Sequence, residues 1–335
     1  MFFVGIDVSK DKLDVCLLGS EMPSVSASFV NQKSGWHSLA KWLKHRHIAQ
    51  PVRICLEATG RYSDAVTAFL YQQGYEISVV NPARIKGYAT SRLSRNKTDQ
   101  VDAALIADFC RAQYADLALW TLPDPAQHEL QALVRQLEDL TTMRQQERNR
   151  LQSGITAVTV LDRIRAHIAF LDAQIKALKD EINDHIDRHP DLKLQRDLLI
   201  SIKGIAHLTA AKLLAEIPHI AAFDSPQQLV AFAGLNPRQH SSGSSIRGKT
   251  HISKVGSSAL RAALYMPAVC AKNTNPLLQP FVQRLQQRGQ CKMSIVVAVM
   301  RKLLHLIFGV LKSQQPFDPL FLEKRLLLLD FTDGI

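Results

Sequence analysis

The order of short apolar segments near the N-terminus constrains the fold of this chain more than any other feature of its sequence. Three runs of strand length come first, separated by polar residues, and helix-length and strand-length segments then alternate. The runs with strand character are 2–8, 13–18, 24–30, 52–57 and 77–80, and the segments with helical periodicity are 35–47 and 61–73. Strands show as short apolar runs bounded by turn residues, whereas helices show apolar residues three or four positions apart.

Three antiparallel strands followed by alternating helices and strands predict a ribonuclease-H-like α/β fold. In that architecture the first and fourth strands are neighbours, so Asp7 and Glu57 would meet at one end of the sheet. A helix expected at about 97–112 would bring Asp99 and Asp102 to the same place, both on one helical face. A carboxylate in a buried strand is costly unless it is paired or binds a cation. We therefore predict that these four residues bind magnesium, which prefers oxygen ligands.

Each acidic residue also has a simpler interpretation when it is taken alone. Asp7 could cap a turn at the end of its strand, and Glu57 could form a salt bridge with Arg61. Asp99 and Asp102 would suit the first turn of a helix, where the helix dipole favours negative charge. All four fall on elements that one fold would bring together, and this conjunction favours a metal site for nucleic-acid chemistry, where divalent cations clamp a phosphodiester.

The remainder of the chain predicts helices. Two prolines close the first domain at 1–122, and a region at 123–192 shows leucine and isoleucine spacing typical of two long helices in a coiled-coil arm. Residues 193–335 form a third, mostly helical domain in this division. Within it, 202–211 resembles a helix-hairpin-helix turn, which presents backbone N–H groups to a DNA phosphate. The expected fold class is thus α/β followed by all-α.

The charge of the chain indicates a polyanionic partner. Lys and Arg number 41 against 30 Asp and Glu, a net charge of +11, and such an excess favours nucleic acid over an anionic membrane. No uncharged apolar run reaches the roughly 18 residues that a membrane-spanning helix needs, and the N-terminus lacks the layout of a signal peptide. Five scattered cysteines without a CxxC pair argue against zinc and disulfides, so we expect reduced thiols in a cytoplasm.

A cluster of serines is the second candidate site. Its members are Ser241, Ser242, Ser244 and Ser245, and the basic residues around it include Arg238, Arg247, Lys254 and Arg261. By composition alone this stretch could be a flexible linker. A serine hydroxyl is a poor nucleophile by itself, but cations that hold a phosphate and stabilise its developing charge could make it competent. The four basic residues are therefore candidate nucleic-acid contacts.

These motifs together resemble one known family. Segments 5–10, 56–60, 81–82 and 96–103 resemble the RuvC-like DEDD domain of insertion sequence 110 transposases, and segments 232–238, 242–248 and 264–268 resemble the serine-bearing domain of that family. The resemblance implies that Asp7, Glu57, Asp99 and Asp102 bind Mg²⁺ and that Ser242 is the nucleophile, with Ser241 as a close neighbour. Family members are recombinases guided by a noncoding bridge or seek RNA that their own element encodes, and that RNA pairs with donor and target DNA.

The resemblance also implies a homo-oligomer, a dimer or a tetramer, in which the acidic domain of one protomer works with the serine domain of another. It places the protein at the nucleoid, in the cytoplasm of a bacterium or archaeon. Our hypothesis is an RNA-guided DNA recombinase that forms a covalent phosphoserine with magnesium assistance. The alternatives are a magnesium-dependent endonuclease of the Holliday-junction-resolvase type, which hydrolyses DNA with water, and a nucleic-acid-binding scaffold without catalysis.

Overall fold

The computed structural model describes residues 1–19, 23–46, 51–58, 60–92, 99–238, 241–242, 246–247 and 251–319. At 61, 99, 100, 241, 242, 246 and 247 the description covers the backbone alone. The chain forms two compact units, Met1–Pro123 and Asp124–Ile335. The finer division into three domains stays a prediction.

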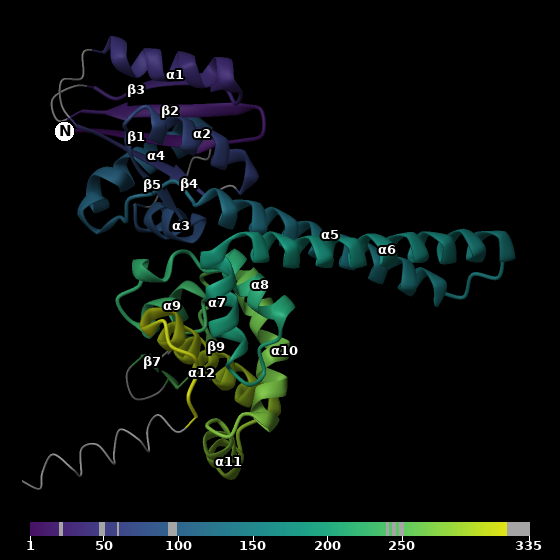
Figure 1. Cartoon of the computed structure of the whole chain (residues 1–335). Helices are drawn as coiled ribbons and strands as arrows, with labels where there is room; N and C mark the ends of the chain where they lie inside the picture. Colours follow the sequence, from purple (N-terminus) through teal and green to yellow (C-terminus); the bar gives the residue numbers. More distant parts are fainter. Residues whose placement is uncertain are drawn as a thin grey trace, which may run out of the picture. The chain divides into compact units, whose positions relative to one another are not determined.

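A mixed five-stranded sheet lies at the centre of the first unit (Figure 1). Its strands are β1 (Phe2–Val8), β2 (Lys12–Leu18), β3 (Val25–Val30), β4 (Val52–Glu57) and β5 (Glu76–Val80), in the spatial order β3-β2-β1-β4-β5. The first three strands pair antiparallel, whereas β4 pairs parallel with both β1 and β5. The predicted α/β arrangement is confirmed, and it makes the first and fourth strands neighbours.

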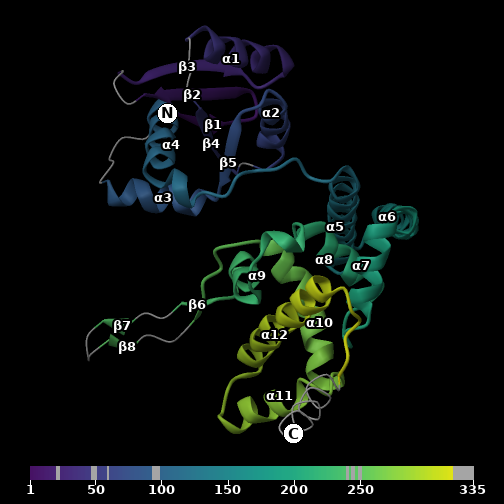
Figure 2. The same ribbon diagram turned by 60° about the vertical axis from the view of Figure 1, so that its left-hand side comes forward.

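Helices cover both faces of this sheet (Figure 2). They are α1 (Lys33–His45), α2 (Arg61–Gln72), α3 (Pro82–Ser91) and α4 (Asp99–Gln113), with a short 3-10 turn, η1 (Tyr114–Asp116), after α4. Side chains alternate along β1, so Val4 and Ile6 pack with the buried residues of α1 and α2, while Phe3 packs with Ile106 of α4. Burial on both faces explains why the strands read as continuous apolar runs.

The second unit is predominantly helical. Its helices are α5 (Pro125–Leu151), α6 (Val158–Arg188), α7 (Pro190–Ile200), α8 (His207–Glu216), α9 (Pro226–Phe232), α10 (Ser258–Thr274), α11 (Gln279–Gln287) and α12 (Lys292–Ser313), with the 3-10 turn η2 (Ile220–Ala222). Helices α5 and α10 are among those that begin at capping residues: Asp124 accepts a hydrogen bond from the backbone N–H of Ala126, and Ser257 accepts one from Leu260. Both caps explain where the helices start.

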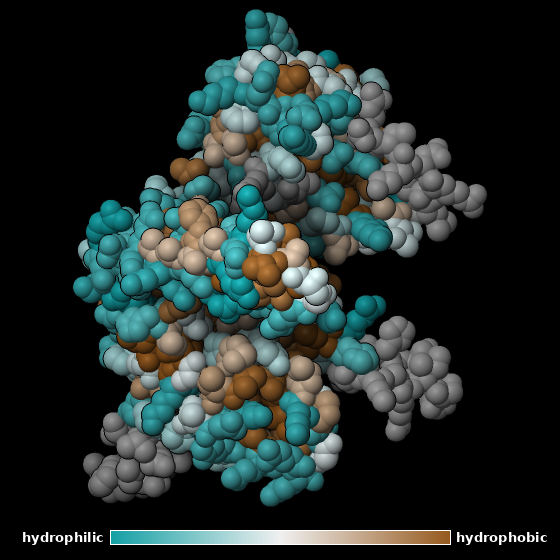
Figure 3. Space-filling model, turned by 90° about the vertical axis from the view of Figure 1, so that its right-hand side faces the viewer, coloured by the Kyte–Doolittle hydropathy of each residue, from teal (hydrophilic) through white to brown (hydrophobic). Residues whose placement is uncertain are grey.

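The two long helices expected in the middle of the chain are α5 and α6, and they lie side by side (Figure 1). Near the start of α5, Leu130 and Val134 belong to the main apolar cluster of the second unit. Farther along the pair, apolar side chains are exposed: Met143 by 48%, Val158 by 67% and Phe170 by 59%. Hydrophilic residues cover most of the face that Figure 3 shows, and the apolar areas between them are separate.

Helix α12 belongs to the apolar core of the second unit. It packs against α7, α9 and α10, and its buried residues include Leu303, Leu304 and Ile307. By length and composition it is the one helix in the described part of the chain that could cross a membrane. Half of its most apolar window is buried inside the protein, as in the core helix of a globular domain.

Candidate functional site

Two of the predicted acidic residues lie at the same end of the central sheet. Strands β1 and β4 are paired in parallel up to Ile6 and Leu56, so Asp7 and Glu57 are the next residues on the two neighbouring strands. Alternation along each strand directs both side chains to the face that α4 covers, away from α1 and α2. Both residues are half-buried and take part in further polar contacts.

Helix α4 approaches this face through a contact that only glycine allows. A Cβ atom on Gly5 would lie 2.2 Å from the carbonyl oxygen of Ala103 and 2.2 Å from the backbone nitrogen of Ala107. The backbones of β1 and α4 therefore touch directly. Asp7 follows Gly5 by two residues on β1, and the half-buried Asp102 directly precedes Ala103 on α4. Asp99 begins α4, and its side chain lies outside the described part.

The chemistry of these residues suits a hard cation. Carboxylate oxygens are the ligands that Mg²⁺ prefers, and the three predicted ligands with described side chains belong to β1, β4 and α4. Among the described side chains, no three His, Cys, Asp or Glu residues are grouped so that they could hold a metal ion. That set lacks the Asp99 side chain. The complete quartet and its magnesium stay predictions.

A fifth carboxylate on the same face was missed by the sequence reasoning. Asp14 pairs with Asp7 across the antiparallel β1–β2 ladder, and it is only 3% exposed. Its carboxylate accepts a hydrogen bond from the Ser28 hydroxyl and forms an ion pair with Nζ of Lys12 at 2.9 Å. The signal was present, because an acidic residue interrupts the apolar β2 segment on the same face of the pleat as Lys12.

The serine stretch contains two short β-ladders, which argues against a flexible linker. Strand β6 (Pro237–Arg238) pairs with β9 (His251–Ile252), and β7 (Ser241–Ser242) pairs with β8 (Ile246–Arg247). In the second ladder Ser242 lies opposite Ile246. The backbone of the predicted nucleophile is thus part of a β-ladder, and we call the described residues of this segment, 237–238, 241–242, 246–247 and 251–252, the serine hairpin.

The base of the serine hairpin is held by two glycines and one arginine. Gly234 and Gly256 both have positive φ angles, and a Cβ on Gly256 would lie 2.2 Å from the carbonyl oxygen of Phe232. Where these two glycines meet, Nη1 of Arg261 donates hydrogen bonds to the carbonyl oxygens of Ala233, at 2.9 Å, and of Gly256, at 3.1 Å. The two ends of the hairpin are therefore tied to each other and to α10.

The four basic residues predicted to contact nucleic acid have different surroundings. Arg238 and Lys254 are exposed on or beside the serine hairpin. The side chain of Arg247 lies outside the description. Arg261 is half-buried, and its Nη1 is committed to backbone carbonyls. The structure thus gives Arg261 a structural role, and nucleic-acid contacts by these residues stay predictions.

The helix-hairpin-helix-like segment forms a turn between α7 and α8. Gly204 occupies that turn with a φ of +108°, and a Cβ there would lie 2.7 Å from the Cβ of Ala271 in α10. The side chain of Asn275 donates a hydrogen bond to the carbonyl oxygen of Lys203 in the same turn. The turn is packed on α10, and a DNA contact through it stays a prediction.

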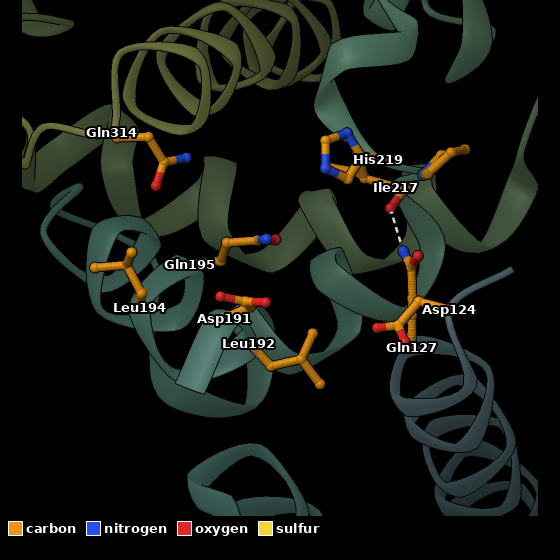
Figure 4. A pocket seen from close by; sticks show the side chains of 10 residues that line it. Asp124, Gln127, Asp191, Leu192, Leu194, Gln195, Ile217, His219 and Gln314 are labelled. Atoms are coloured by element: carbon orange, nitrogen blue, oxygen red, sulfur yellow. Dashed lines mark hydrogen bonds between the residues drawn. The ribbon is translucent and has the colours of Figure 1, made fainter. Parts of the chain in front are cut away.

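A polar hollow of about 440 Å³ also opens on the second unit. The start of α5, helix α7, the turn before η2 and the end of α12 line it, and Figure 4 shows the amide of Gln127 directed to the carbonyl oxygen of Ile217. Asp124, Asp191 and His219 are the titratable residues of its lining. The hollow is separate from the serine hairpin, none of whose residues lines it.

Comparisons with known proteins agree with these motifs. A transposase family model of the DEDD IS110 type matches residues 4–160, and the model of the transposase IS116/IS110/IS902 family matches residues 196–283. The pilin gene-inverting protein of Moraxella bovis is 32% identical over 94% of this chain and 97% of its own length. The transposase for insertion sequence element IS1111A of Coxiella burnetii is 26% identical over 78% of this chain and 75% of its own length. The solved structure of Thermus thermophilus RuvC matches 36% of this chain and all of its own, with 14% identity and a TM-score of 0.26.

Proposed function

The chain belongs to the IS110 family of transposases and is therefore a DNA transposase or recombinase, and we propose that it cuts and rejoins DNA through a covalent bond to Ser242, guided by an RNA. The observation that carries this proposal is the serine hairpin. Its backbone ladder holds Ser242 opposite Ile246, and Arg261 fixes the base from which it extends. Such positioning is what a serine nucleophile needs if it is to reach a phosphate in one defined orientation.

The proposed reaction exchanges one phosphodiester for another. The Ser242 oxygen attacks a backbone phosphorus and forms a new P–O bond while the bond to one deoxyribose oxygen breaks. The hydroxyl proton of the serine is lost, and the leaving oxygen gains a proton, so the exchange is balanced. Rejoining repeats the exchange with a hydroxyl from another strand and consumes no water. Exposed cations such as Arg238 would hold the phosphate during the attack.

Asp7, Glu57, Asp99 and Asp102 are the residues that would hold Mg²⁺. When bound, the cation supplies positive charge that stabilises the phosphate as it is attacked. Each compact unit carries one of the two predicted sites, the acidic residues in Met1–Pro123 and the serine hairpin in Asp124–Ile335. This separation is compatible with an active site composed from two protomers.

The need to rejoin the broken strands favours a covalent protein–DNA intermediate over hydrolysis of the DNA. The Moraxella relative is, by its name, a protein that inverts a pilin gene. Inversion of a DNA segment requires strands to be broken and rejoined at both ends. A covalent protein–DNA bond keeps the energy of the broken phosphodiester for the rejoining step, whereas the resolvase-type alternative would leave free ends.

The covalent step is tested on a single peptide. The protein is expressed with its native flanking DNA, complexes are isolated under denaturing conditions, and nuclease and trypsin are applied. Cleavage after Arg238 and Arg247 releases residues 239–247, which contain both candidate serines. We expect mass spectrometry to place the residual nucleotide on Ser242, Ser242→Ala to abolish the adduct, and Ser241→Ala to retain it. Free DNA ends without an adduct would favour the hydrolytic endonuclease.

The guide RNA is supported by the net charge of +11 and by family membership. Sequencing of the RNA that co-purifies from the same cells tests it directly. We expect one discrete RNA from the DNA that flanks the gene. Random cellular RNA, or none, would contradict RNA guidance without touching the covalent chemistry.

Protomer pairing through α5 and α6 completes the proposal. Met143, Val158 and Phe170 expose apolar side chains on these helices, and we take them as candidate contacts with a second protomer. We expect light scattering to show a dimer or a tetramer and Phe170→Ser to shift the distribution toward smaller species. An unchanged mass for this variant would exclude the exposed ring from the interface.

A recombinase of this kind acts on chromosomal DNA, which places it in the cytoplasm.

A further inference from the structure

The positive charge of this chain is concentrated in one part of its sequence. Residues 225–317 contain twelve Lys and Arg and no Asp or Glu. The rest of the chain has 29 basic and 30 acidic residues and is therefore balanced. The whole net charge of +11 thus comes from the segment that carries the serine hairpin and helices α10 to α12. Part of this charge lies outside the serine hairpin.

Six of these basic residues lie on α11 and α12 or at their ends, and four of them concern us here: Arg284, Arg288, Arg301 and Lys302. We call them the α11–α12 cationic surface. Arg284 and Lys302 come from different helices and both lie over the ring of Phe281, with Cζ at 5.8 Å and Nζ at 5.4 Å from its centroid. The ring thus favours the position of both cations, because its face attracts positive charge.

The cations of this surface have no acidic partners in the described part of the chain. Every ion pair described in the second unit uses a carboxylate at or before Glu216. On α5 and α6, by contrast, Arg144 pairs with Asp172 and Arg165 pairs with Asp162. Within the part of the chain that the structure describes, no carboxylate competes with an external anion for the α11–α12 cationic surface.

The surroundings of Arg301 point the same way. Its Nε atom is buried and has no hydrogen-bond partner among the described residues. Burial, together with the charges of Lys302 and Arg301, lowers the pKa of the neighbouring His305. Like charges are thus crowded on this part of α12, and no ion pair joins them to a carboxylate among the described residues, an arrangement that an incoming polyanion would relieve.

We propose that the α11–α12 cationic surface binds the phosphate backbone of duplex DNA, as an anchoring surface separate from the serine hairpin. Helices give it a rigid frame, and exposed arginines, lysines and glutamines are the side chains that contact phosphates. Duplex DNA fits better than a single strand, because the one ring of this surface, Phe281, is half-buried under two cations and offers no stacking platform. A membrane fits poorly, because the apolar residues of α12 lie in the protein core.

This inference rests on the proposed function only in taking DNA as the substrate. The test uses the full chain and a fluorescein-labelled duplex of about 30 base pairs with arbitrary sequence, with anisotropy read at several salt concentrations. The variant is Arg284→Gln with Lys302→Gln. The matched control, Arg165→Gln with Lys179→Gln, removes the same charge from exposed positions on α6. Melting curves of all proteins confirm that both pairs leave the fold intact.

The slope of log affinity against log salt reports the number of phosphates neutralised, at about 0.9 for each. We expect the α11–α12 variant to lose about tenfold in affinity and to lower the slope by about 1.8, while the control stays near the parent. Equal slopes for variant and control would overturn the proposal. A single-stranded RNA of equal length, or anionic vesicles, showing a larger loss than the duplex would also overturn it in favour of that partner.

Adduct formation separates this proposal from the covalent chemistry. If the adduct at Ser242 is found but the α11–α12 variant binds duplex normally, the anchoring surface is wrong and the recombinase proposal stands. If no adduct is found but the duplex affinity depends on Arg284 and Lys302, the anchoring surface stands without the serine chemistry.

Discussion

The contact between β1 and α4 yields a sharp prediction for Gly5→Ala. The new methyl group would lie 2.2 Å from the carbonyl oxygen of Ala103 and from the backbone nitrogen of Ala107, and 2.9 Å from the Cα of Ala107. Ordinary contacts of this kind exceed 3 Å, so α4 must retreat by about 1 Å. Overpacking of a core costs about 1–3 kcal/mol, and disturbing the helical hydrogen bond between these residues adds about 1 kcal/mol. We expect the free energy of unfolding of the first unit to fall by about 3 kcal/mol.

Tryptophan fluorescence measures this unit selectively. All three tryptophans of the chain, Trp36, Trp42 and Trp120, lie in Met1–Pro123. With a urea dependence of about 2 kcal/mol per molar, the midpoint should fall by about 1.5 M. Because α4 carries Asp102, we also expect less DNA adduct from the folded variant at low urea.

Gly87→Ala is the matched control. Gly87 lies in α3, and no atom comes within 4 Å of the position its Cβ would take. Alanine in a helix is favoured over glycine by about 0.5–1 kcal/mol, so this variant should be slightly stabilised. If Gly5→Ala unfolds at the same urea concentration as Gly87→Ala, the direct packing of α4 on β1 is refuted.

Three further perturbations have expected outcomes. Burial raises the pKa of Asp108, but hydrogen bonds from Tyr88 and Arg111 and the charge of Arg92 outweigh it, so the pKa is lowered. We expect Asp108→Asn to lower the free energy of unfolding by about 1 kcal/mol above pH 5. Urea titrations should show this difference vanishing as the pH falls below about 3.8, the ordinary pKa of the group. Burial raises the pKa of Glu216, so ionisation of this carboxyl destabilises the fold as the pH rises through that pKa. Thermal melts from pH 4 to 8 should therefore show a smaller fall in melting temperature for Glu216→Gln than for the parent. Arg261→Gln removes the arginine at the base of the serine hairpin; we expect trypsin to cleave at Arg238 and Arg247 several-fold faster than in the parent, whereas equal rates would contradict a role of Arg261 in holding that base.

The sequence was sufficient for the strand order of the first unit. Alternation and apolar run length carry the information for β1 to β5, because each strand is long enough to show its period. The neighbourhood of Asp7 and Glu57 then follows from topology alone. The close contact at Gly5 did not follow, since a glycine in a strand has many causes and its partner Ala103 is far away in the sequence.

The serine hairpin lay beyond sequence reasoning for a different reason. Its strands are two residues long, too short to display a period of two, and serine and glycine composition is typical of linkers. The hydrogen bonds of Arg261 were also not foreseen from its charge, because its acceptors are backbone carbonyls that no side-chain pattern reveals. Asp14 and the segment 225–317, which lacks Asp and Glu, were by contrast visible in the sequence. Finding them required only that the charged residues be located along the chain as well as counted.

The closed base of the serine hairpin separates the residues on which the helical core depends from the residues between the two ends, whose sequence and length can vary. Backbone bonds from Ser253 to Asn236 and from Lys254 to Gly234 join the two ends. Once the ends are joined, doubling the length of the intervening chain costs only about 0.6 kcal/mol of closure entropy. Selection, or an engineer, can therefore lengthen or rewrite residues between the two ends, and with them the DNA contacts beside Ser242, while the helices beneath remain as they are.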